Sequence, residues 1–285
     1  MEIGIFARTF EAPTLAGVLD AVAAHGIRYI QFNVSCMARS DMPDGVDTAS
    51  FSQARRQMDA RNIEAVSLSA TYNMIHPNPA VRDRGMRRLQ LLAAHAADLG
   101  TNLLTLCTGT RDPHNMWAGH PQNASPEAWS DLLASIERAL TIASEHNVCL
   151  GIEPEVSNVV SSPYKARELL DTMQSHRLTI VMDGANVFAR GTINRQRQVL
   201  DEAFELLGER IALAHAKDLS RDGEAGQEAA GTGLLDYDHY LELLHRSGYR
   251  GALVLHSLSS EQVPGCVRFL QQKLQALPRD RRSAQ

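Results

Sequence analysis

The sequence contains few aromatic residues and no excess of positive charge. Phe, Trp and Tyr together make up 5% of its 285 residues, so it offers few rings for stacking against the bases of single-stranded nucleic acid. The formal net charge is -5 at pH 7, which gives no electrostatic reason to expect a polyanionic partner. We therefore expect no nucleic-acid partner.

Cysteines are few, and long apolar runs are missing. The four cysteines are far apart and form no CxxC pair, so we expect free thiols in a reducing compartment. The N-terminus passes directly into a strand-like stretch, without the pattern of a signal peptide. No segment is long and apolar enough to span a bilayer. We expect a soluble cytoplasmic protein without a membrane partner.

Short apolar runs typical of buried strands alternate with amphipathic stretches typical of helices. Strands are expected at residues 2–7, 27–32, 63–69, 102–107, 148–153, 178–182, 211–214 and 252–255. Helices are expected to begin near residues 14, 48, 80, 126, 162, 193, 236 and 260. Such alternation with short links predicts parallel strands joined by right-handed crossovers.

Eight strand–helix units in a chain of this length predict an α/β fold of the (β/α)8 TIM barrel type. We expect one domain covering residues 1–285, with residues 278–285 as a flexible tail. An open, doubly wound sheet is the competing architecture. It would need a glycine-rich phosphate loop after a strand, and the sequence contains neither GxGxxG nor a Walker A motif.

Ionisable residues follow the apolar runs at the points where strands are expected to end. The clearest case is the segment 148–155, VCLGIEPE, in which Glu153 and Glu155 flank Pro154. Proline cannot donate a hydrogen bond within a sheet, so it ends the strand at the first acid. Because burying an unpaired charge costs several kcal/mol, core packing gives no reason for an acid at this place.

Three further strand ends carry such groups, namely Asp183, His215 and His256. All strand ends of a barrel open on one face, so these residues and Glu153 should converge. Carboxylates and imidazoles suit one divalent metal ion, such as Mn²⁺, Mg²⁺, Co²⁺, Fe²⁺ or Zn²⁺. The alternative is four ordinary polar residues, but without a metal these groups would repel one another or stay unsatisfied.

Four motifs carry a resemblance to a known family. They are IEP at 152–154, MDGAN at 182–186, HAKD at 215–218 and GTGLLDY at 231–237. With them, the chain resembles the xylose isomerase-like barrels, which include sugar isomerases and sugar phosphate isomerase/epimerases, over residues 3–274. The resemblance implies that Glu153, Asp183 and His215 hold a divalent metal. It also places Arg221 where sugar epimerases of the family often have a substrate-binding arginine.

The chain departs from the family pattern at two positions. His256 stands where many epimerases carry a glutamate, and Asn186 stands where a histidine often follows the strand-six aspartate. Histidine still ligates metals and moves protons, with a reference pKa of about 6.5. However, the pair of carboxylates that exchanges a proton between two faces of an enediolate is incomplete, which puts simple two-glutamate epimerisation in question.

We predict a divalent-metal-dependent isomerase or epimerase of a small sugar or sugar derivative, in which a side chain removes an α-proton and returns it elsewhere. The base candidates are Glu155, His256 and, less favoured, Glu153, and Lys217 would stabilise the enediolate. Substrate contacts are predicted at Arg8, Asn33, Tyr72, His76, Arg111, Trp117, His120, Asn186 and Arg221.

Three alternatives remain open at this stage. A metal-dependent lyase or deglycosylase acting on an oxidised sugar would use the same proton chemistry and expel a leaving group. An endonuclease IV-like phosphodiesterase would need more metal ligands and a basic groove, which the charge balance disfavours. A barrel that only binds a ligand would hold no metal. A homodimer built through the long loop after the fourth strand is also compatible with the sequence.

Overall fold

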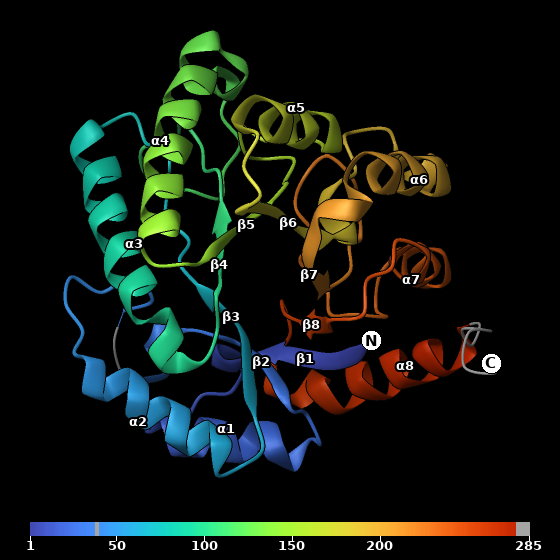
Figure 1. The fold of residues 1–285 in the computed structure, drawn as a ribbon. Coiled ribbons are helices and arrows are strands. Elements are labelled where there is room, and N and C mark those ends of the chain that lie inside the picture. Colours follow the sequence, from blue (N-terminus) through green and yellow to red (C-terminus); the bar gives the residue numbers. More distant parts are fainter. Residues whose placement is uncertain (38–39, 278–285) are drawn as a thin grey trace, which may run out of the picture.

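The computed structural model of the protein describes residues 1–37 and 40–277. In this part of the chain, eight parallel strands pair in sequence order and close into a barrel, with β8 beside β1 (Figure 1). The strands are β1 (Glu2–Phe6), β2 (Tyr29–Phe32), β3 (Glu64–Ser69), β4 (Leu103–Cys107), β5 (Cys149–Glu153), β6 (Leu178–Asp183), β7 (Ile211–Ala216) and β8 (Ala252–Leu255). The predicted (β/α)8 barrel is confirmed.

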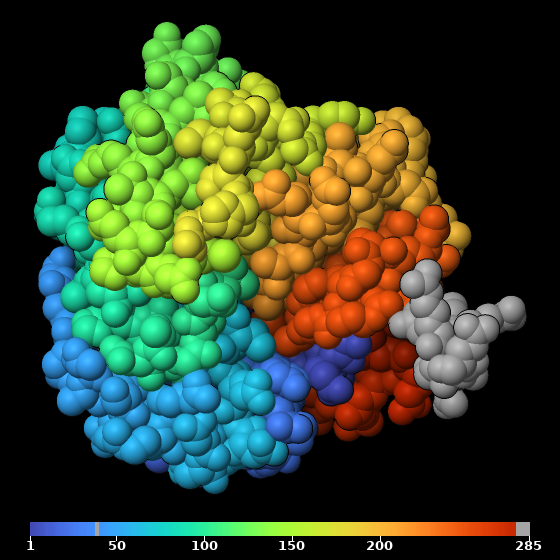
Figure 2. Space-filling model, in the orientation of Figure 1, coloured from blue at the N-terminus to red at the C-terminus, as the bar shows by residue number. Residues whose placement is uncertain are grey.

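Each strand is followed by an α-helix, and the helices surround the barrel (Figure 1). They are α1 (Leu15–Ala24), α2 (Thr48–Asp59), α3 (Pro79–Leu99), α4 (Pro126–Glu145), α5 (Pro163–Met173), α6 (Gln196–Leu207), α7 (Tyr237–Arg246) and α8 (Val263–Ala276). Because consecutive units are neighbours, the colours of Figure 2 follow one another around the surface. The tail predicted at residues 278–285 lies outside the described residues.

Side-chain caps explain why several helices begin where the sequence predicts. Ser125 accepts a hydrogen bond from the backbone N–H of Ala128 at the start of α4, and Ser162 does the same for Lys165 at the start of α5. A proline follows each serine, where its missing N–H costs nothing. At the C-terminal end of α3, Gly100 adopts the left-handed conformation, with φ +94, and the helix ends there.

The helices bury one face against the outside of the barrel. In α4 the buried side chains include Leu132, Ile136 and Ala143, which recur at helical spacing. On the opposite side of the barrel wall, the interior holds a separate apolar cluster that includes Phe6, Val181, Leu213 and Val254. Among the described residues, no helix combines the length and apolar character needed to cross a membrane.

Gly151 leaves room for neighbouring side chains inside the barrel. A Cβ at this position would lie 2.8 Å from Cγ2 of Val181 and 3.3 Å from Cδ1 of Leu103. We expect Gly151→Ala to destabilise the protein by about 1–3 kcal/mol, because a close-packed core cannot absorb an added carbon without strain. Denaturant unfolding measures this change in free energy.

Gly265 provides the matched control for this substitution. It lies in α8, and a Cβ there would meet no other group within 4 Å. Gly265→Ala should leave stability unchanged or raise it by about 0.5–1 kcal/mol, since alanine loses less backbone freedom in a helix. Equal stabilities for the two variants would contradict the assigned packing of the barrel interior.

Candidate metal centre

Four consecutive strands place the predicted ligands at one mouth of the barrel. Glu153 and Asp183 are the last residues of β5 and β6, His215 lies near the end of β7, and His256 follows β8. One possible ligand atom from each residue lies within 4.8 Å of those of the other three. The structure therefore brings together the four residues that the sequence placed at separate strand ends. We call Glu153, Asp183, His215 and His256 the ligand group.

Asp183 lies at the centre of this group. Its Oδ1 accepts a hydrogen bond from the N–H of Ala185, while its Oδ2 lies 2.9 Å from Nε2 of His256 and 3.4 Å from Nζ of Lys217. Burial alone would raise the pKa of Asp183. The charge of Lys217 and the close contact with His256 outweigh burial, so the pKa lies well below its usual value. Asp183 is therefore an anion at neutral pH.

His215 presents an unpartnered nitrogen to the two carboxylates. Its buried Nδ1 has no hydrogen-bond partner and lies 3.5 Å from Oε2 of Glu153 and 3.8 Å from Oδ2 of Asp183. A buried polar atom without a partner is costly. A divalent cation between this nitrogen and the carboxylates would satisfy all three groups, so the residues present fit such an ion.

Glu153 is held from the side by Asn186. The Nδ2 of Asn186 donates to Oε1 of Glu153 at 2.6 Å, and Oδ1 of Asn186 accepts from the N–H of Gly226. Burial opposes ionisation of Glu153, but the electrostatic attraction of His215, whose Nδ1 lies 3.5 Å away, lowers the pKa of this carboxyl below its usual value. Glu153 therefore supplies a second fixed carboxylate.

His256 is fixed between a ring and a carboxylate. It stacks on Phe6, with ring centroids 4.8 Å apart and planes 16° apart. Burial, followed by repulsion from His215 and Lys217, lowers the pKa of His256 to about 4. The imidazole is therefore neutral at pH 7, which is the form that ligates metals. Ser257, the next residue, adopts φ +56, a strained conformation for a non-glycine residue beside the site.

A cavity of about 560 Å³ is lined by two of the four residues of the ligand group, Glu153 and His256. Its volume falls within the range of small-molecule sites. Its polar and charged lining consists of Arg8, Gln31, Asn33, Asp41, Ser69, Thr71, Thr105, Glu153, Glu155, Lys217, Gln227, His256 and Ser257, and Phe6, Leu106, Met116, Trp117 and Ala225 complete the wall. Most of this lining can exchange hydrogen bonds with a polyhydroxylated ligand.

Two charged groups line the cavity beside the ligand group. Glu155 is 4% exposed, and its Oε1 has no hydrogen-bond partner. Burial and repulsion from Glu153 raise the pKa of Glu155 to about 7, which is near the value that suits a general base at neutral pH. Lys217 is 4% exposed and follows β7 directly. Both residues were predicted from their places after strands.

Three predicted substrate contacts also line the cavity. Asn33 is 1% exposed, and its Oδ1 has no hydrogen-bond partner. Trp117 is half exposed and belongs to the long loop after β4. Arg8 lines the mouth and forms an ion pair with Asp41 at 3.0 Å. These residues remain candidates for substrate binding.

The six other predicted substrate contacts do not line this cavity, because each side chain has other partners. Tyr72 is buried against Gly85 of α3 and directs its hydroxyl at the sulfur of Met86. Arg111 bonds the carbonyl of Ile75 and pairs with Asp131 at 2.7 Å. The sequence interpretation of these two side chains as sugar contacts is not supported by their positions.

The remaining four predicted contacts also have other partners. His76 lies beside the carbonyl of Pro113, and His120 caps the short helix at residues 121–124. Arg221 is exposed and forms an ion pair with Glu224. Asn186 holds Glu153 as described above, so it acts behind the ligand group rather than in the cavity lining.

Gln31 is the main site residue that the prediction missed. Its side chain is 2% exposed and its Oε1 lies 3.0 Å from Nε2 of His215. A signal was present, because Gln31 is a polar amide between the apolar residues Ile30 and Phe32 of β2. Ser69 and Thr105 line the cavity from β3 and β4 and gave no such signal, since a single small hydroxyl residue in a strand does not indicate a site.

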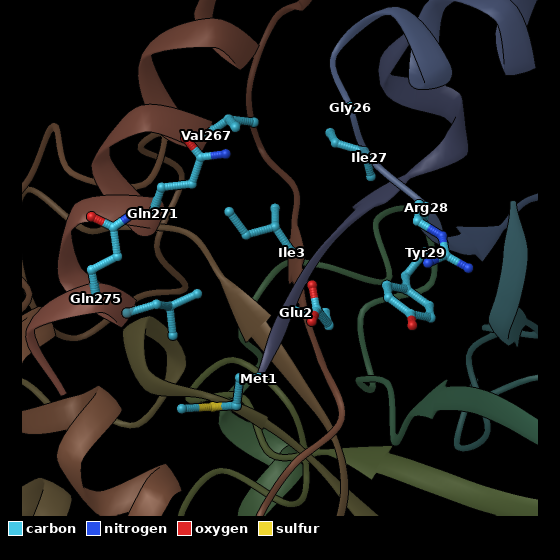
Figure 3. A pocket seen from close by; sticks show the side chains of 11 residues that line it. Met1, Glu2, Ile3, Gly26, Ile27, Arg28, Tyr29, Val267, Gln271 and Gln275 are labelled. Carbon is cyan, nitrogen blue, oxygen red and sulfur yellow. The ribbon is translucent and has the colours of Figure 1, made fainter. Parts of the chain in front are cut away.

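A second cavity, of about 230 Å³, lies among the N-terminal ends of β1 and β2 and helix α8 (Figure 3). Glu2, Arg28 and Tyr29 line it on one side, and Gln271 and Gln275 line it on the other. It lies at the opposite ends of the strands from the ligand group. Catalytic sites in this fold lie at the carboxyl ends of the strands, so this cavity is not the candidate site.

A family comparison is consistent with this geometry. The family model described as xylose isomerase-like TIM barrel matches residues 19–273. The chain belongs to this family. A comparison of this xylose isomerase-like barrel with curated proteins returns no match.

Solved structures share the architecture across nearly the whole chain. A D-tagatose 3-epimerase-like protein matches with a TM-score of 0.76 and 15% identity, covering 96% of this chain and 97% of that chain. The IolI protein with a bound zinc atom matches with a TM-score of 0.70 and 16% identity, covering 95% of this chain and 96% of that chain. D-allulose 3-epimerase from Methylomonas sp. in complex with D-allulose matches with a TM-score of 0.71 and 16% identity, covering 96% of this chain and 97% of that chain. At these identities the likeness shows the shared fold.

Proposed function

We propose that this xylose isomerase-like barrel is a divalent-metal-dependent isomerase or epimerase of a small sugar or sugar derivative. The observation that carries the proposal is a single cavity lined by Glu153 and His256, two of the four candidate ligands, together with the buried residues Glu155 and Lys217. The similar folds of a D-tagatose 3-epimerase-like protein and of D-allulose 3-epimerase support a carbohydrate as the substrate.

Glu153, Asp183, His215 and His256 would hold the metal ion. When bound, such an ion supplies Lewis-acid chemistry, which polarises a carbonyl group and acidifies the neighbouring C–H. The IolI protein, which shares this fold, has a bound zinc atom, and this supports a metal cofactor. The neutral form of His256 suits this ligand role.

Glu155 is the proposed base. Glu155 lines the cavity, and its carboxylate would accept the α-proton of a bound sugar. Lys217 lines the same cavity and is directed toward Oδ2 of Asp183 at 3.4 Å. Its ammonium group would stabilise the negative charge that develops on the substrate oxygen as the proton leaves.

The cavity also supports a sugar as the substrate class. Asn33, Thr71 and Ser257 line the cavity, and their amide and hydroxyl groups can exchange hydrogen bonds with sugar hydroxyls. Trp117 offers a flat ring at the mouth, and such rings pack against the apolar C–H faces of ligands. We propose that these groups orient the substrate over Glu155.

A metal-dependent lyase or deglycosylase acting on an oxidised sugar is the second candidate. It is favoured by His256, which stands at the end of β8 where a second catalytic carboxylate would be needed for a two-face proton exchange. After Glu155 removes the proton, expulsion of a leaving group needs no second base. The endonuclease-like alternative is disfavoured, because the described residues hold one group of four possible ligands rather than a larger cluster.

A solvent-exchange experiment tests the proposal. The protein loaded with Mn²⁺ is incubated in D₂O with a panel of aldoses and ketoses, and the recovered sugars are analysed by mass spectrometry and NMR. We expect deuterium next to the carbonyl carbon of at least one sugar and conversion to an isomer or epimer. Exchange followed by release of a leaving group would select the lyase. A panel without any exchange, on protein shown to hold metal, would overturn both.

A further inference from the structure

Gln31 connects four strands inside the barrel and contacts His215 of the ligand group. It lies in β2 and is 2% exposed. Its Nε2 donates to Oγ of Ser69 in β3 at 2.8 Å and to Oγ1 of Thr105 in β4 at 3.0 Å. Its Oε1 lies 3.0 Å from Nε2 of His215 in β7. Because β8 and β1 separate β7 from β2 in the sheet, this last contact crosses the barrel interior.

The polarity of this network determines which nitrogen of His215 carries the proton. In the structure the amide NH₂ of Gln31 donates to the two hydroxyls, and the carbonyl oxygen faces the imidazole. A carbonyl oxygen only accepts, and therefore Nε2 of His215 must donate. The neutral ring then has its lone pair on Nδ1. That atom is the one that faces Glu153 and Asp183 without a hydrogen-bond partner.

We propose that Gln31 is a positioning residue, which holds His215 in the Nε2–H tautomer and so presents Nδ1 to the metal ion. This inference rests on the proposed function, because it requires the metal centre. The second hydrogen bond of a metal-bound histidine commonly fixes both its tautomer and its ring orientation. Here the acceptor is an amide that hydroxyls of two other strands, β3 and β4, hold in place.

The other neighbours of His215 do not provide this control. Phe6 contacts the ring edge to face at 5.3 Å, and His256 lies 4.6 Å away between ring centroids. Such contacts restrict the ring but do not distinguish one tautomer from the other. Without the Gln31 carbonyl, a proton on Nδ1 would find Glu153 at 3.5 Å as its acceptor, and the lone pair would be turned away from the carboxylates.

Three variants separate positioning from packing. Gln31→Met keeps the length of the side chain and removes the acceptor. Gln31→Glu keeps an acceptor for His215 and can itself accept from the hydroxyls of Ser69 and Thr105, so it serves as the conservative rescue. Ser67→Ala is the matched control, because Ser67 is a buried polar residue of β3 whose Oγ has no partner and which does not line the cavity.

The affinity for Zn²⁺ is measured for each purified protein by competition with a chelator, after circular dichroism has shown that the fold is kept. We expect the Kd of Gln31→Met to rise by about 10–100-fold, as for other losses of such supporting hydrogen bonds. Gln31→Glu and Ser67→Ala should keep the parent affinity. In the zinc-loaded parent labelled with ¹⁵N-histidine, NMR should show a proton on Nε2 of His215.

The results separate the inference from the function on which it rests. A parent protein that binds no Zn²⁺ at this site would remove the proposed metal centre. A parent that binds Zn²⁺, with Gln31→Met binding equally well, would overturn only the role of Gln31. An NMR spectrum with the proton on Nδ1 of His215 would overturn it as well, whereas weak binding by Gln31→Met and rescue by Gln31→Glu would support it.

Discussion

Asp183→Asn is expected to remove nearly all metal from the protein. The substitution keeps the size of the side chain but removes the charge of the buried oxygen that faces His215, His256 and Lys217. An amide in its place would also direct either a weaker acceptor or an NH₂ group at the cation. We expect bound metal to fall by roughly 100-fold or more, which exceeds the loss expected for a supporting residue. Elemental analysis after Mn²⁺ loading and desalting measures the metal content.

A matched control distinguishes ligand loss from general damage. Asp201 bonds Nε2 of His239 at 2.8 Å, so it is an aspartate–histidine pair outside the cavity. Asp201→Asn should keep its full metal content. Asp183→Asn leaves Lys217 without its close carboxylate, which costs stability, so circular dichroism must show that the variant is folded. A folded Asp183→Asn protein with parental metal content would contradict the assignment.

Glu155→Gln is expected to stop proton exchange while leaving metal binding intact. The substitution keeps a polar side chain of the same size in a position that is 4% exposed, but an amide cannot take up the proton. General-base catalysis contributes about 10²–10⁴-fold, and we expect the exchange rate in D₂O to fall by that factor. The measurement is deuterium incorporation into the sugar that the parent protein converts, with metal content determined on the same sample.

Glu224→Gln is the control for this result. Glu224 carries a carboxylate in the loop that contributes Ala225 and Gln227 to the cavity, but it pairs with exposed Arg221 and does not line the cavity. Its loss should not change exchange by more than experimental error. If Glu155→Gln exchanged as fast as the parent, the base would have to be sought elsewhere, first at His256.

Much of the fold followed from local patterns. The run at 148–153 predicts a buried strand, and the serine–proline pairs at Ser125 and Ser162 predict helix starts, because each signal depends on residues that are close in sequence. The convergence of Glu153 and Asp183 also followed, since a closed parallel barrel places all its strand ends on one face. Sequence order and barrel topology were therefore sufficient to predict that the four residues of the ligand group lie together.

The loop residues could not be predicted in the same way. Arg111 and Trp117 belong to one long segment. The side chain of Arg111 forms an ion pair with Asp131 of α4, whereas Trp117 lines the cavity. Nothing in the segment identifies Asp131 as a partner, because the contact depends on how a helix and a loop pack. Gln31 was missed for a related reason, since its importance comes from contacts with Ser69, Thr105 and His215.

The central claim is that one divalent cation lies among the ends of β5, β6, β7 and β8. The most direct measurement is anomalous X-ray diffraction from crystals of the protein loaded with Mn²⁺. We predict a single strong anomalous peak bounded by Glu153, Asp183, His215 and His256, with Nδ1 as the contact atom of His215. Anomalous density elsewhere, or none among these four side chains in metal-loaded crystals, would contradict this account.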